Sequence, residues 1–304
     1  MLGSGYSGAS AIKDYLSGRP DISSPLEDSE FELIHDSHGI IDLDNSLNNF
    51  YSVNGASYAL DKFEEFSKNY SINIPYKNRK HYLKNIKDYI NNITQLNYKG
   101  LPKSRLEEFG FIYKRIELFC RKLHFKLGRK YASGIMRVPV NKDKFFKETV
   151  KLIDNIFDNT SSANNKIIVD QGGSFWHPFT STKYYGSRKV IVVTRDPRDI
   201  YSDLKSKGYA YPGGDPSVFC MWYKEVMSRI SITEWENKHV VHIKFEDFVL
   251  DFENNRKNLC EFLDLNDSIK SSYSVENSKI NIGKFRNSLL SNELRVIESE
   301  LNQY

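Results

Sequence analysis

The sequence lacks a signal-peptide pattern, a transit-peptide pattern and any apolar run of about 18 residues or more. Its 304 residues include only three cysteines, and their spacing fits neither a metal site nor a Cys-x-x-Cys motif. An odd, widely spaced set favours buried thiols in a reducing compartment. These absences predict a cytoplasmic protein without a membrane-spanning helix. The three cysteines are Cys120, Cys220 and Cys260.

The chain also lacks a large net charge, because 43 Lys and Arg residues face 39 Asp and Glu residues, for a formal charge of +4. That balance argues against a nucleic-acid binder driven by overall charge. An aromatic content of 13% argues against disorder. Neither an internal repeat nor a long linker is visible. We therefore expect one domain around a sizeable core, with room for an insertion.

A lysine is missing from the first motif. Residues 3–10 read Gly-Ser-Gly-Tyr-Ser-Gly-Ala-Ser, which matches the phosphate-binding pattern G-x-x-x-x-G-K-S/T except that Ala9 replaces the lysine. Backbone N–H groups and a helix N-terminus can hold an anion without that lysine. The phosphates of ATP would lose their usual counter-charge, so the loop predicts a phosphate that is bound but not transferred. A disordered Gly/Ser-rich terminus is the alternative.

The residues after this loop predict a helix. Residues 11–16 are helix-compatible, Gly18 suits a C-terminal cap, and Pro20 prevents continuation. Only Met1 and Leu2 precede the loop, although a core strand usually supplies about five residues. We therefore expect either a very short first strand or a native start upstream.

Apolar runs without polar alternation predict buried parallel strands. We expect strands at residues 167–169 and 190–193, one nearer the sheet edge at 240–245, and a weaker one at 31–34. Helices are expected at 145–157, 197–207 and 252–263, the last with Asp251 as its N-cap. Alternating strands and helices predict an α/β fold with a mainly parallel sheet.

The middle of the chain, residues 46–164, has an almost purely helical pattern, with amphipathic helices expected over 80–96 and 111–127. The simplest organisation is a single domain, whose core comprises residues 1–44 and 165–304 and whose helical insertion comprises 45–164. The basic segment 114–130 is expected to be a solvated helix face, with contact to an anionic acceptor as the alternative.

A second motif follows the strand at 190–193. Asp196 can cap a helix and Pro197 suits its first turn, which puts Arg195 at the carboxyl end of a buried strand. Ligands bind at that edge of open α/β sheets, and the arginine fork suits a phosphate. An ion pair between Arg195 and Asp196 or Asp199 on a surface turn is the alternative.

Together these motifs resemble the sulfotransferases that use 3′-phosphoadenosine 5′-phosphosulfate (PAPS). Residues 245–248, 259–265 and 278–285 are similar to the last strand and helix of that family and to its closing basic-glycine segment. The resemblance implies a P-loop-NTPase-like three-layer fold, PAPS as donor, 3′,5′-ADP (PAP) as product, and no metal. It implies this nucleotide-binding set: Gly5, Tyr6, Ser7, Gly8, Ala9 and Ser10 at the 5′-phosphosulfate, Arg195 and Ser202 at the 3′-phosphate, and Lys279, Gly283 and Lys284 over the nucleotide.

Two positions depart from the pattern of that family. Tyr6 stands where Lys or Arg is usual, so Lys13 or Arg19 would have to supply the charge. The serine that binds the 3′-phosphate commonly lies eight residues after the arginine, where this chain has Asp203. Ser202 is favoured instead, because an aspartate would repel a phosphate unless it faced away.

Three groups are candidates for the base that takes the proton of the acceptor hydroxyl, in this order of preference. Glu30 resembles a glutamate of carbohydrate sulfotransferases, His177 lies where cytosolic sulfotransferases have a histidine, and Asp170 ends the strand at 167–169. Each has an ordinary alternative as a surface, loop or capping residue. A further group resembles a metal site, although local hydrogen bonding is the simpler interpretation, and comprises His35, Asp36 and His38.

The sequence thus predicts in-line transfer of a sulfuryl group from PAPS to a hydroxyl. A carbohydrate acceptor is favoured because aromatic rings stack on sugar faces, although core packing would explain about half of the candidate rings. The alternatives are a small-molecule kinase with a degenerate P-loop and a non-catalytic adenosine-nucleotide-binding protein. The candidate rings are Trp176, Tyr184, Tyr185, Tyr209, Tyr211, Trp222 and Tyr223.

Overall fold

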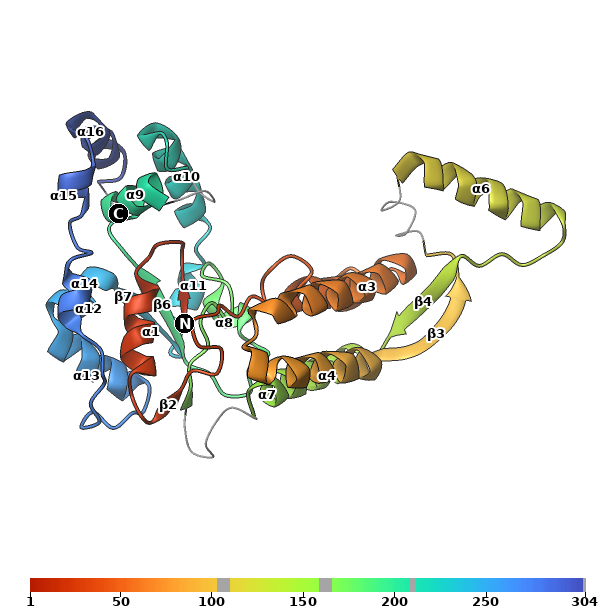
Figure 1. Cartoon of the computed structure of the whole chain (residues 1–304), viewed down its shortest axis with the longest axis horizontal. Helices are drawn as coiled ribbons and strands as arrows, with labels where there is room; N and C mark the ends of the chain where they lie inside the picture. The colour runs from red at the N-terminus through yellow and green to blue at the C-terminus, as the bar shows by residue number, and fades with distance from the viewer. Residues whose placement is uncertain (103–109, 159–165, 208–211, 303–304) are drawn as a thin grey trace. The chain divides into compact units, whose positions relative to one another are not determined.

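The computed structural model describes residues 1–102, 110–158, 166–207 and 212–302 of the chain (Figure 1). Two units can be distinguished. The sheet unit comprises Met1–Phe31, Thr160–Lys183 and Ser187–Tyr304, and the helical unit comprises Glu32–Asn159 and Tyr184–Gly186. The expected α/β class is confirmed, with a small parallel sheet in the sheet unit. Among the described helices, none combines the length and the apolar character needed to cross a membrane.

The apolar run at 190–193 forms the centre of the parallel sheet. Ile191 and Val193 pack on one face, and Val190 and Val192 pack on the other. Burial on both faces explains why this strand shows no polar alternation. The strand pairs in parallel with two neighbours, which gives the order β1-β6-β7 and confirms the predicted edge position of β7. The strands are β1 (Leu2–Gly3), β6 (Val190–Thr194) and β7 (Val240–Lys244).

Strands β2 (Ile22–Ser23) and β5 (Lys166–Ile167) form a separate parallel pair, and the residues after β5 contact the start of the chain. The Met1 nitrogen donates to the Val169 carbonyl (2.6 Å), and the Gln171 nitrogen donates to the Met1 carbonyl (2.8 Å). The strand expected at 167–169 is therefore regular only at its start. Its continuation still runs beside β1, and this brings Asp170 alongside the first strand.

Helices begin and end in the sheet unit where the local signals predict. Helix α1 (Ala9–Ser17) starts after Gly8 and is capped by Gly18. Helix α9 (Pro197–Lys207) starts where Asp196 Oδ1 accepts a hydrogen bond from the Arg198 backbone (2.8 Å). The other helices are α8 (Pro178–Ser181), α10 (Pro216–Ser228), α11 (Ile232–Trp235), α12 (Phe245–Leu250), α13 (Phe252–Phe262), α14 (Val275–Lys279), α15 (Phe285–Ser288) and α16 (Ser291–Glu300).

Helices of this unit contribute to two clusters of buried apolar side chains. Residues of α1, α12 and α13 pack on the face of β6 that carries Ile191 and Val193. Residues of α9, α10 and α16 form a second cluster around Tyr201 and Phe219. The predicted helix at 252–263 is confirmed as α13, but Asp251 makes no side-chain cap and instead accepts a hydrogen bond from Asn254 (2.9 Å).

The helical unit contains a two-stranded antiparallel sheet, which the sequence did not predict. Strands β3 (Thr94–Gly100) and β4 (Gly134–Pro139) pair antiparallel. The prediction of an almost purely helical segment over 46–164 is therefore wrong, and the helix expected over 80–96 ends at Ile93. Strand β3 finds its partner about 40 residues away, a distance over which local periodicity carries no information. The helices are α2 (Ile40–Asp44), η1 (Asn45–Asn49), α3 (Val53–Tyr70), η2 (Ser71–Asn73), α4 (Tyr76–Ile93), α6 (Gly110–Lys126) and α7 (Lys142–Asp158).

The strand expected at 31–34 is also wrong. These residues form a turn, in which the carbonyls of Leu33 and Ile34 accept hydrogen bonds from Ile40 (2.9 Å) and Ile41 (3.0 Å). Both apolar side chains are fully buried. A short apolar run signals burial rather than a strand, and here the burial is that of a turn leading into α2.

Candidate functional site

The glycine-serine loop is an ordered turn between β1 and α1. Tyr6 and Gly8 both have positive φ angles, 62° and 79°. A Cβ atom at Gly8 would lie 2.6 Å from the Phe245 ring, so both the backbone conformation and the packing require glycine there. The Ala11 nitrogen, in the first turn of α1, donates to the Gly8 carbonyl (3.1 Å), and the N–H groups that begin a helix lack the carbonyl acceptor of a preceding turn. The alternative of a disordered terminus is therefore wrong, and the loop presents backbone donors at the end of the first strand.

Arg195 joins this loop to the late segment at 278–285. Its guanidinium donates to the Tyr6 carbonyl (3.2 Å) and to the Asn281 carbonyl (2.7 Å), and its side chain is only 4% exposed. Arg195 lies directly after β6, whose C-terminal end adjoins that of β1. Three segments that are far apart in the sequence thus meet around one arginine.

Asp203 supplies the anion for Arg195. Its carboxylate lies 2.6 Å from Arg195 Nη1 and 3.3 Å from Lys284 Nζ. Burial raises the pKa of Asp203, but the hydrogen bond and charge of Arg195, together with Lys284, outweigh burial and lower it. The alternative of an ion pair between Arg195 and Asp196 or Asp199 is wrong, because Asp203 is the partner of Arg195. The Asp203 carboxylate thus contacts two cations that the sequence predicts at the nucleotide, Arg195 at the 3′-phosphate and Lys284 in the closing segment.

Asp199 fixes the late segment against α9. Its side chain accepts hydrogen bonds from the backbone nitrogens of Gly283 (2.7 Å) and Phe285 (3.1 Å), and it is 1% exposed. Gly283 has a φ of 72°, a conformation that favours glycine. This positioning role was missed in the sequence, where Asp199 was considered only as a partner of Arg195. The one sequence feature that could have indicated this role is the position of Asp199 in the first turn of α9.

The remaining residues predicted for the nucleotide lie in different surroundings. Ser202 is buried, and its hydroxyl lies 2.7 Å from the Ser288 hydroxyl. Lys279 is exposed and pairs with Glu276 on its own helix (2.6 Å). Of the two predicted lysines, Lys284 is therefore the one that the structure brings to the Arg195 cluster.

Lys13 is the buried cation nearest in sequence to the loop. It lies one turn along α1 from Ala9 and has a side-chain exposure of 9%. Its Nζ lies 3.6 Å from Asp170 and 3.9 Å from the exposed Asp28. Asp170 Oδ1 is buried, and among the described residues it has no hydrogen-bond partner. Lys13 and Asp170 form a charge pair beside β1.

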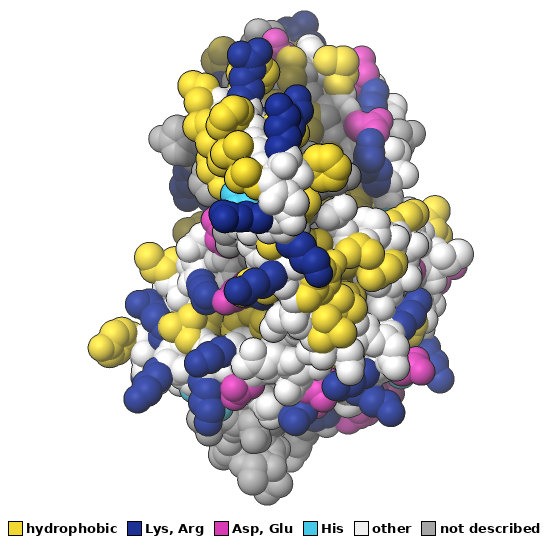
Figure 2. Space-filling view, turned by 90° about the vertical axis from the view of Figure 1, so that its right-hand side faces the viewer, with side chains coloured by type: hydrophobic (Ala, Val, Ile, Leu, Met, Phe, Trp, Pro, Cys, Tyr) yellow, Lys and Arg dark blue, Asp and Glu magenta, His cyan; other side chains and the backbone are white. Residues whose placement is uncertain are grey.

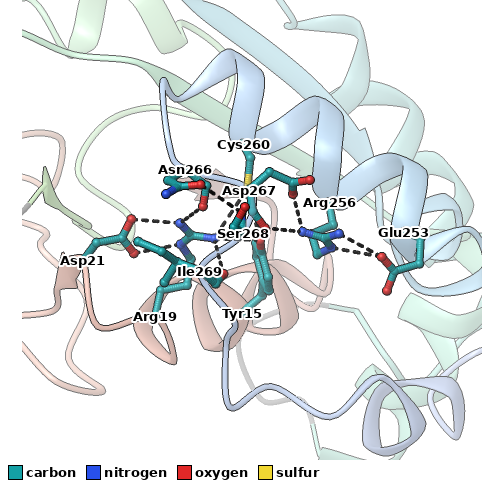
Figure 3. A network of polar contacts seen from close by, with 10 residues as sticks. All are labelled: Tyr15, Arg19, Asp21, Glu253, Arg256, Cys260, Asn266, Asp267, Ser268 and Ile269. Atoms are coloured by element: carbon teal, nitrogen blue, oxygen red, sulfur yellow. Dashed lines mark hydrogen bonds and ion pairs between the residues drawn. The ribbon is translucent and has the colours of Figure 1, made fainter.

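Arg19, the other candidate for the missing loop cation, belongs to a structural network at the opposite end of α1 (Figure 3). It forms two hydrogen bonds with Asp21 (3.0 and 2.8 Å) and donates to the carbonyls of Asn266 (2.9 Å) and Ile269 (3.0 Å). Its side chain is fully buried. These bonds attach the end of α1 to the turn after α13, so Arg19 is not available to the loop.

The structure divides the three candidate bases between two places. Asp170 lies beside Lys13, and its carbonyl accepts a hydrogen bond from the Phe31 nitrogen (2.7 Å), which brings the exposed Glu30 into the same neighbourhood. His177 lies at the start of α8, with Nδ1 3.4 Å from Glu234 of α11. The structure thus groups Glu30 with Asp170 and places His177 beside another helix.

Glu246 is a further residue of this region that the sequence did not single out. Its carboxylate accepts a hydrogen bond from the Asp196 nitrogen (3.0 Å), immediately after Arg195. Burial raises the pKa of Glu246, and the positive charge of Arg195 works in the opposite direction. Glu246 therefore holds the backbone where β6 passes into α9.

The candidate sugar-stacking rings are mostly occupied in packing. The Trp176 indole donates to the Val226 carbonyl (2.8 Å), the Tyr184 hydroxyl donates to Asp44 (2.7 Å), and Tyr223 is buried in the cluster of α9, α10 and α16. Tyr209 and Tyr211 lie outside the described residues. For Trp176, Tyr184 and Tyr223, core packing is the better explanation.

The group suggested by metal-ligand chemistry shows local hydrogen bonding. The Asp36 carboxylate accepts from the Ser37 nitrogen (2.7 Å), and the His38 nitrogen donates to Asp42 (2.8 Å). Throughout the described part of the chain, no three His, Cys, Asp or Glu side chains are grouped closely enough to hold a metal ion.

The chain was compared with known protein families, curated proteins and solved structures. No protein-family model, curated protein or solved structure matches the chain. The candidate site therefore rests on the residues and their geometry.

Proposed function

We propose that the sheet unit binds an adenosine nucleotide with phosphates at both ends of its ribose, and that it transfers a sulfuryl group from PAPS to a carbohydrate hydroxyl. The observation that carries this proposal is the position of Arg195, which donates to the loop at Tyr6 and to the late segment at Asn281. The proposed fold is P-loop-NTPase-like, with helices on both faces of the parallel sheet.

In the proposed complex, the two ends of the nucleotide contact different parts of this cluster. The loop and the N-terminus of α1 bind the 5′-phosphosulfate through backbone N–H groups. Arg195 and Lys284 bind the 3′-phosphate, which displaces the Asp203 carboxylate. Arg195 and Lys284 carry two positive charges and share the single negative charge of Asp203. A phosphate dianion would therefore neutralise both cations.

The chemical step needs alignment and a base. The acceptor oxygen bonds to sulfur as the bond from sulfur to the 5′-phosphate oxygen breaks, and the hydroxyl proton passes to the base. Glu30 and Asp170 are the preferred bases because their segment lies beside β1 and Lys13. In this scheme Lys13 supplies positive charge near the loop that Ala9 and Tyr6 do not.

A non-catalytic nucleotide-binding protein is the second candidate function. The observation in its favour is Asp203, which stands between Arg195 and Lys284 and would repel a 3′-phosphate. A protein of this kind would bind a nucleotide through the loop alone. It would then not distinguish PAP from 5′-ADP.

Thermal unfolding with PAP, 5′-ADP, AMP and ATP with Mg²⁺ separates these functions. A ligand at 100 times its Kd should stabilise the protein by about 2.7 kcal/mol, and we expect PAP to do so at the lowest concentration. Arg195→Ala should weaken PAP binding by ~1.5–3 kcal/mol, whereas Arg229→Ala, on an exposed helix end, should not. Equal stabilisation by PAP and 5′-ADP would favour the non-catalytic protein, and stabilisation by ATP with Mg²⁺ alone would favour a kinase.

Transfer itself is tested with labelled PAPS and a panel of sugars. Glu30→Gln should leave PAP binding intact and lower turnover by ~10²–10⁴-fold. A fully active Glu30→Gln enzyme would show that Glu30 is not the base and would leave Asp170 and His177 as candidates. Tight PAP binding without transfer to any acceptor would argue for the non-catalytic protein.

A further inference from the structure

Helix α6 (Gly110–Lys126) has an apolar face that the rest of the described chain does not cover. Its apolar residues recur at spacings of three and four, which places them on one side of a helix. In an ordinary helix of a globular protein such a face is buried in the core. Here the side chains of that face are between 44% and 75% exposed. They are Ile112, Ile116, Phe119, Leu123 and, just beyond the helix, Leu127.

Further apolar side chains of the same helix are exposed outside this face. Phe111 is 68% exposed, Leu118 48% and Phe125 85%. In Figure 2, α6 lies at the top of the view, where apolar and basic side chains adjoin. The prediction of a merely solvated helix face is therefore incomplete, because water would contact a large apolar surface.

The same segment is strongly basic. Residues 110–130 contain seven Lys and Arg residues and a single acidic residue, Glu117. Glu117 is 8% exposed and accepts a hydrogen bond from the Tyr131 hydroxyl (2.7 Å), so it contributes little negative charge to the surface. Arg115, Lys122 and Lys126 follow one border of the apolar face, at positions i, i+7 and i+11. Long basic side chains at such a border can extend toward an anionic surface while their stems remain in apolar contact.

We propose that α6 binds the surface of an anionic lipid bilayer, with its apolar face in the headgroup region and its basic border against acidic headgroups. A basic amphipathic helix with several large apolar residues binds membranes in this way. A second copy of the chain would cover the apolar face, but it would bring two strongly positive helices together. An acidic polysaccharide or nucleic acid would match the charge but leave the apolar face uncovered. The inference concerns the helical unit and does not depend on the proposed function.

Vesicle flotation with the full chain tests this proposal. We expect the protein to float with phosphatidylcholine vesicles that contain about 30% phosphatidylglycerol, and not with pure phosphatidylcholine. Raising the salt to about 0.5 M should reduce binding severalfold. Ile116→Glu with Phe119→Glu should reduce partitioning at least about tenfold, because two charges enter the apolar face. Ile72→Glu is the matched control, because Ile72 is 74% exposed on η2 of the same unit.

A second variant separates the charge from the apolar contact. Arg115→Glu with Lys122→Glu should weaken binding to anionic vesicles and remove most of its dependence on salt. All substituted side chains are exposed, so each variant should show the circular dichroism spectrum of the folded wild type.

Three outcomes would overturn the proposal. The first is absence of wild-type binding to anionic vesicles, or equal binding by the Ile116→Glu, Phe119→Glu variant. The second is a dimer in sedimentation velocity that these substitutions dissociate, without vesicle binding, which would assign the face to a second copy. The third is binding to heparin but not to vesicles, which would assign the helix to an anionic polymer.

Discussion

Replacing Asp203 with asparagine removes the carboxylate that lies between Arg195 and Lys284 while retaining the size of the side chain. The Asp203 and Arg195 side chains are 12% and 4% exposed. Loss of one partner from a buried ion pair costs about 3–5 kcal/mol, because the other charge is left uncompensated. Asparagine still accepts one hydrogen bond, and Lys284 is 31% exposed, so we expect the lower end, about 3 kcal/mol.

The same substitution should have the opposite effect on ligand binding. A carboxylate and a phosphate charge about 5 Å apart repel by roughly 3 kcal/mol at an effective dielectric constant of about 20. Part of this repulsion is avoided if the Asp203 side chain turns away. We therefore expect Asp203→Asn to bind PAP about ten- to a hundredfold more tightly, a gain of about 1.4–2.8 kcal/mol. The affinity for AMP should change little, because AMP has no 3′-phosphate.

Urea unfolding and calorimetric titration with PAP and AMP measure both effects. Asp247→Asn is the control, because Asp247 is an exposed carboxylate on α12 of the same unit. An unchanged urea midpoint for Asp203→Asn would refute the stabilising role of the ion pair. PAP affinity equal to that of the wild type would show that Asp203 does not compete with a phosphate, and Arg195 would then not be the 3′-phosphate site.

Three further predictions concern the stability of the sheet unit. Arg19→Met should lower the free energy of unfolding by ~3–5 kcal/mol in urea titrations, because Asp21 and two carbonyls lose their donor; an unaltered midpoint would contradict this. Asp199→Ala should cost ~2–4 kcal/mol and speed amide hydrogen exchange around Gly283, because two buried N–H groups lose their acceptor; unchanged exchange there would exclude the positioning role. The lowered pKa of Asp203 stabilises the fold above the ordinary value of 3.8, and this contribution is lost as pH falls through the lower folded-state pKa. Acid titrations should therefore show a steeper loss of stability for the wild type than for Asp203→Asn, and parallel curves would refute this.

Local signals in the sequence were sufficient for the elements that form the candidate site. The apolar run at 190–193, the cap at Asp196 and the proline at Pro197 located β6 and α9, and the glycines around the loop located α1. These features depend on backbone preferences and on burial of both faces of a strand, which neighbouring residues determine.

Other features depended on residues that are distant in the sequence. The antiparallel pair β3–β4 joins segments about 40 residues apart, and nothing in the local pattern of residues 94–100 distinguishes β3 from a helix end. Sequence reasoning treated Arg19 as a possible loop cation because it lies near the loop along the chain. Helix α1 separates the two, and the carbonyls after α13 bind Arg19 instead.

The pairing of charges was decided by the tertiary structure alone. The sequence indicated that Arg195 would need an anion and offered Asp196, Asp199 or an external phosphate. The structure selects Asp203, two turns along α9, because that side chain faces the guanidinium while Asp199 faces the backbone of the late segment. The sequence by itself determined which residues carry charge at the end of β6. The partner of Arg195 was decided by the direction in which each aspartate side chain leaves α9, because ion pairs form between groups that are close in space.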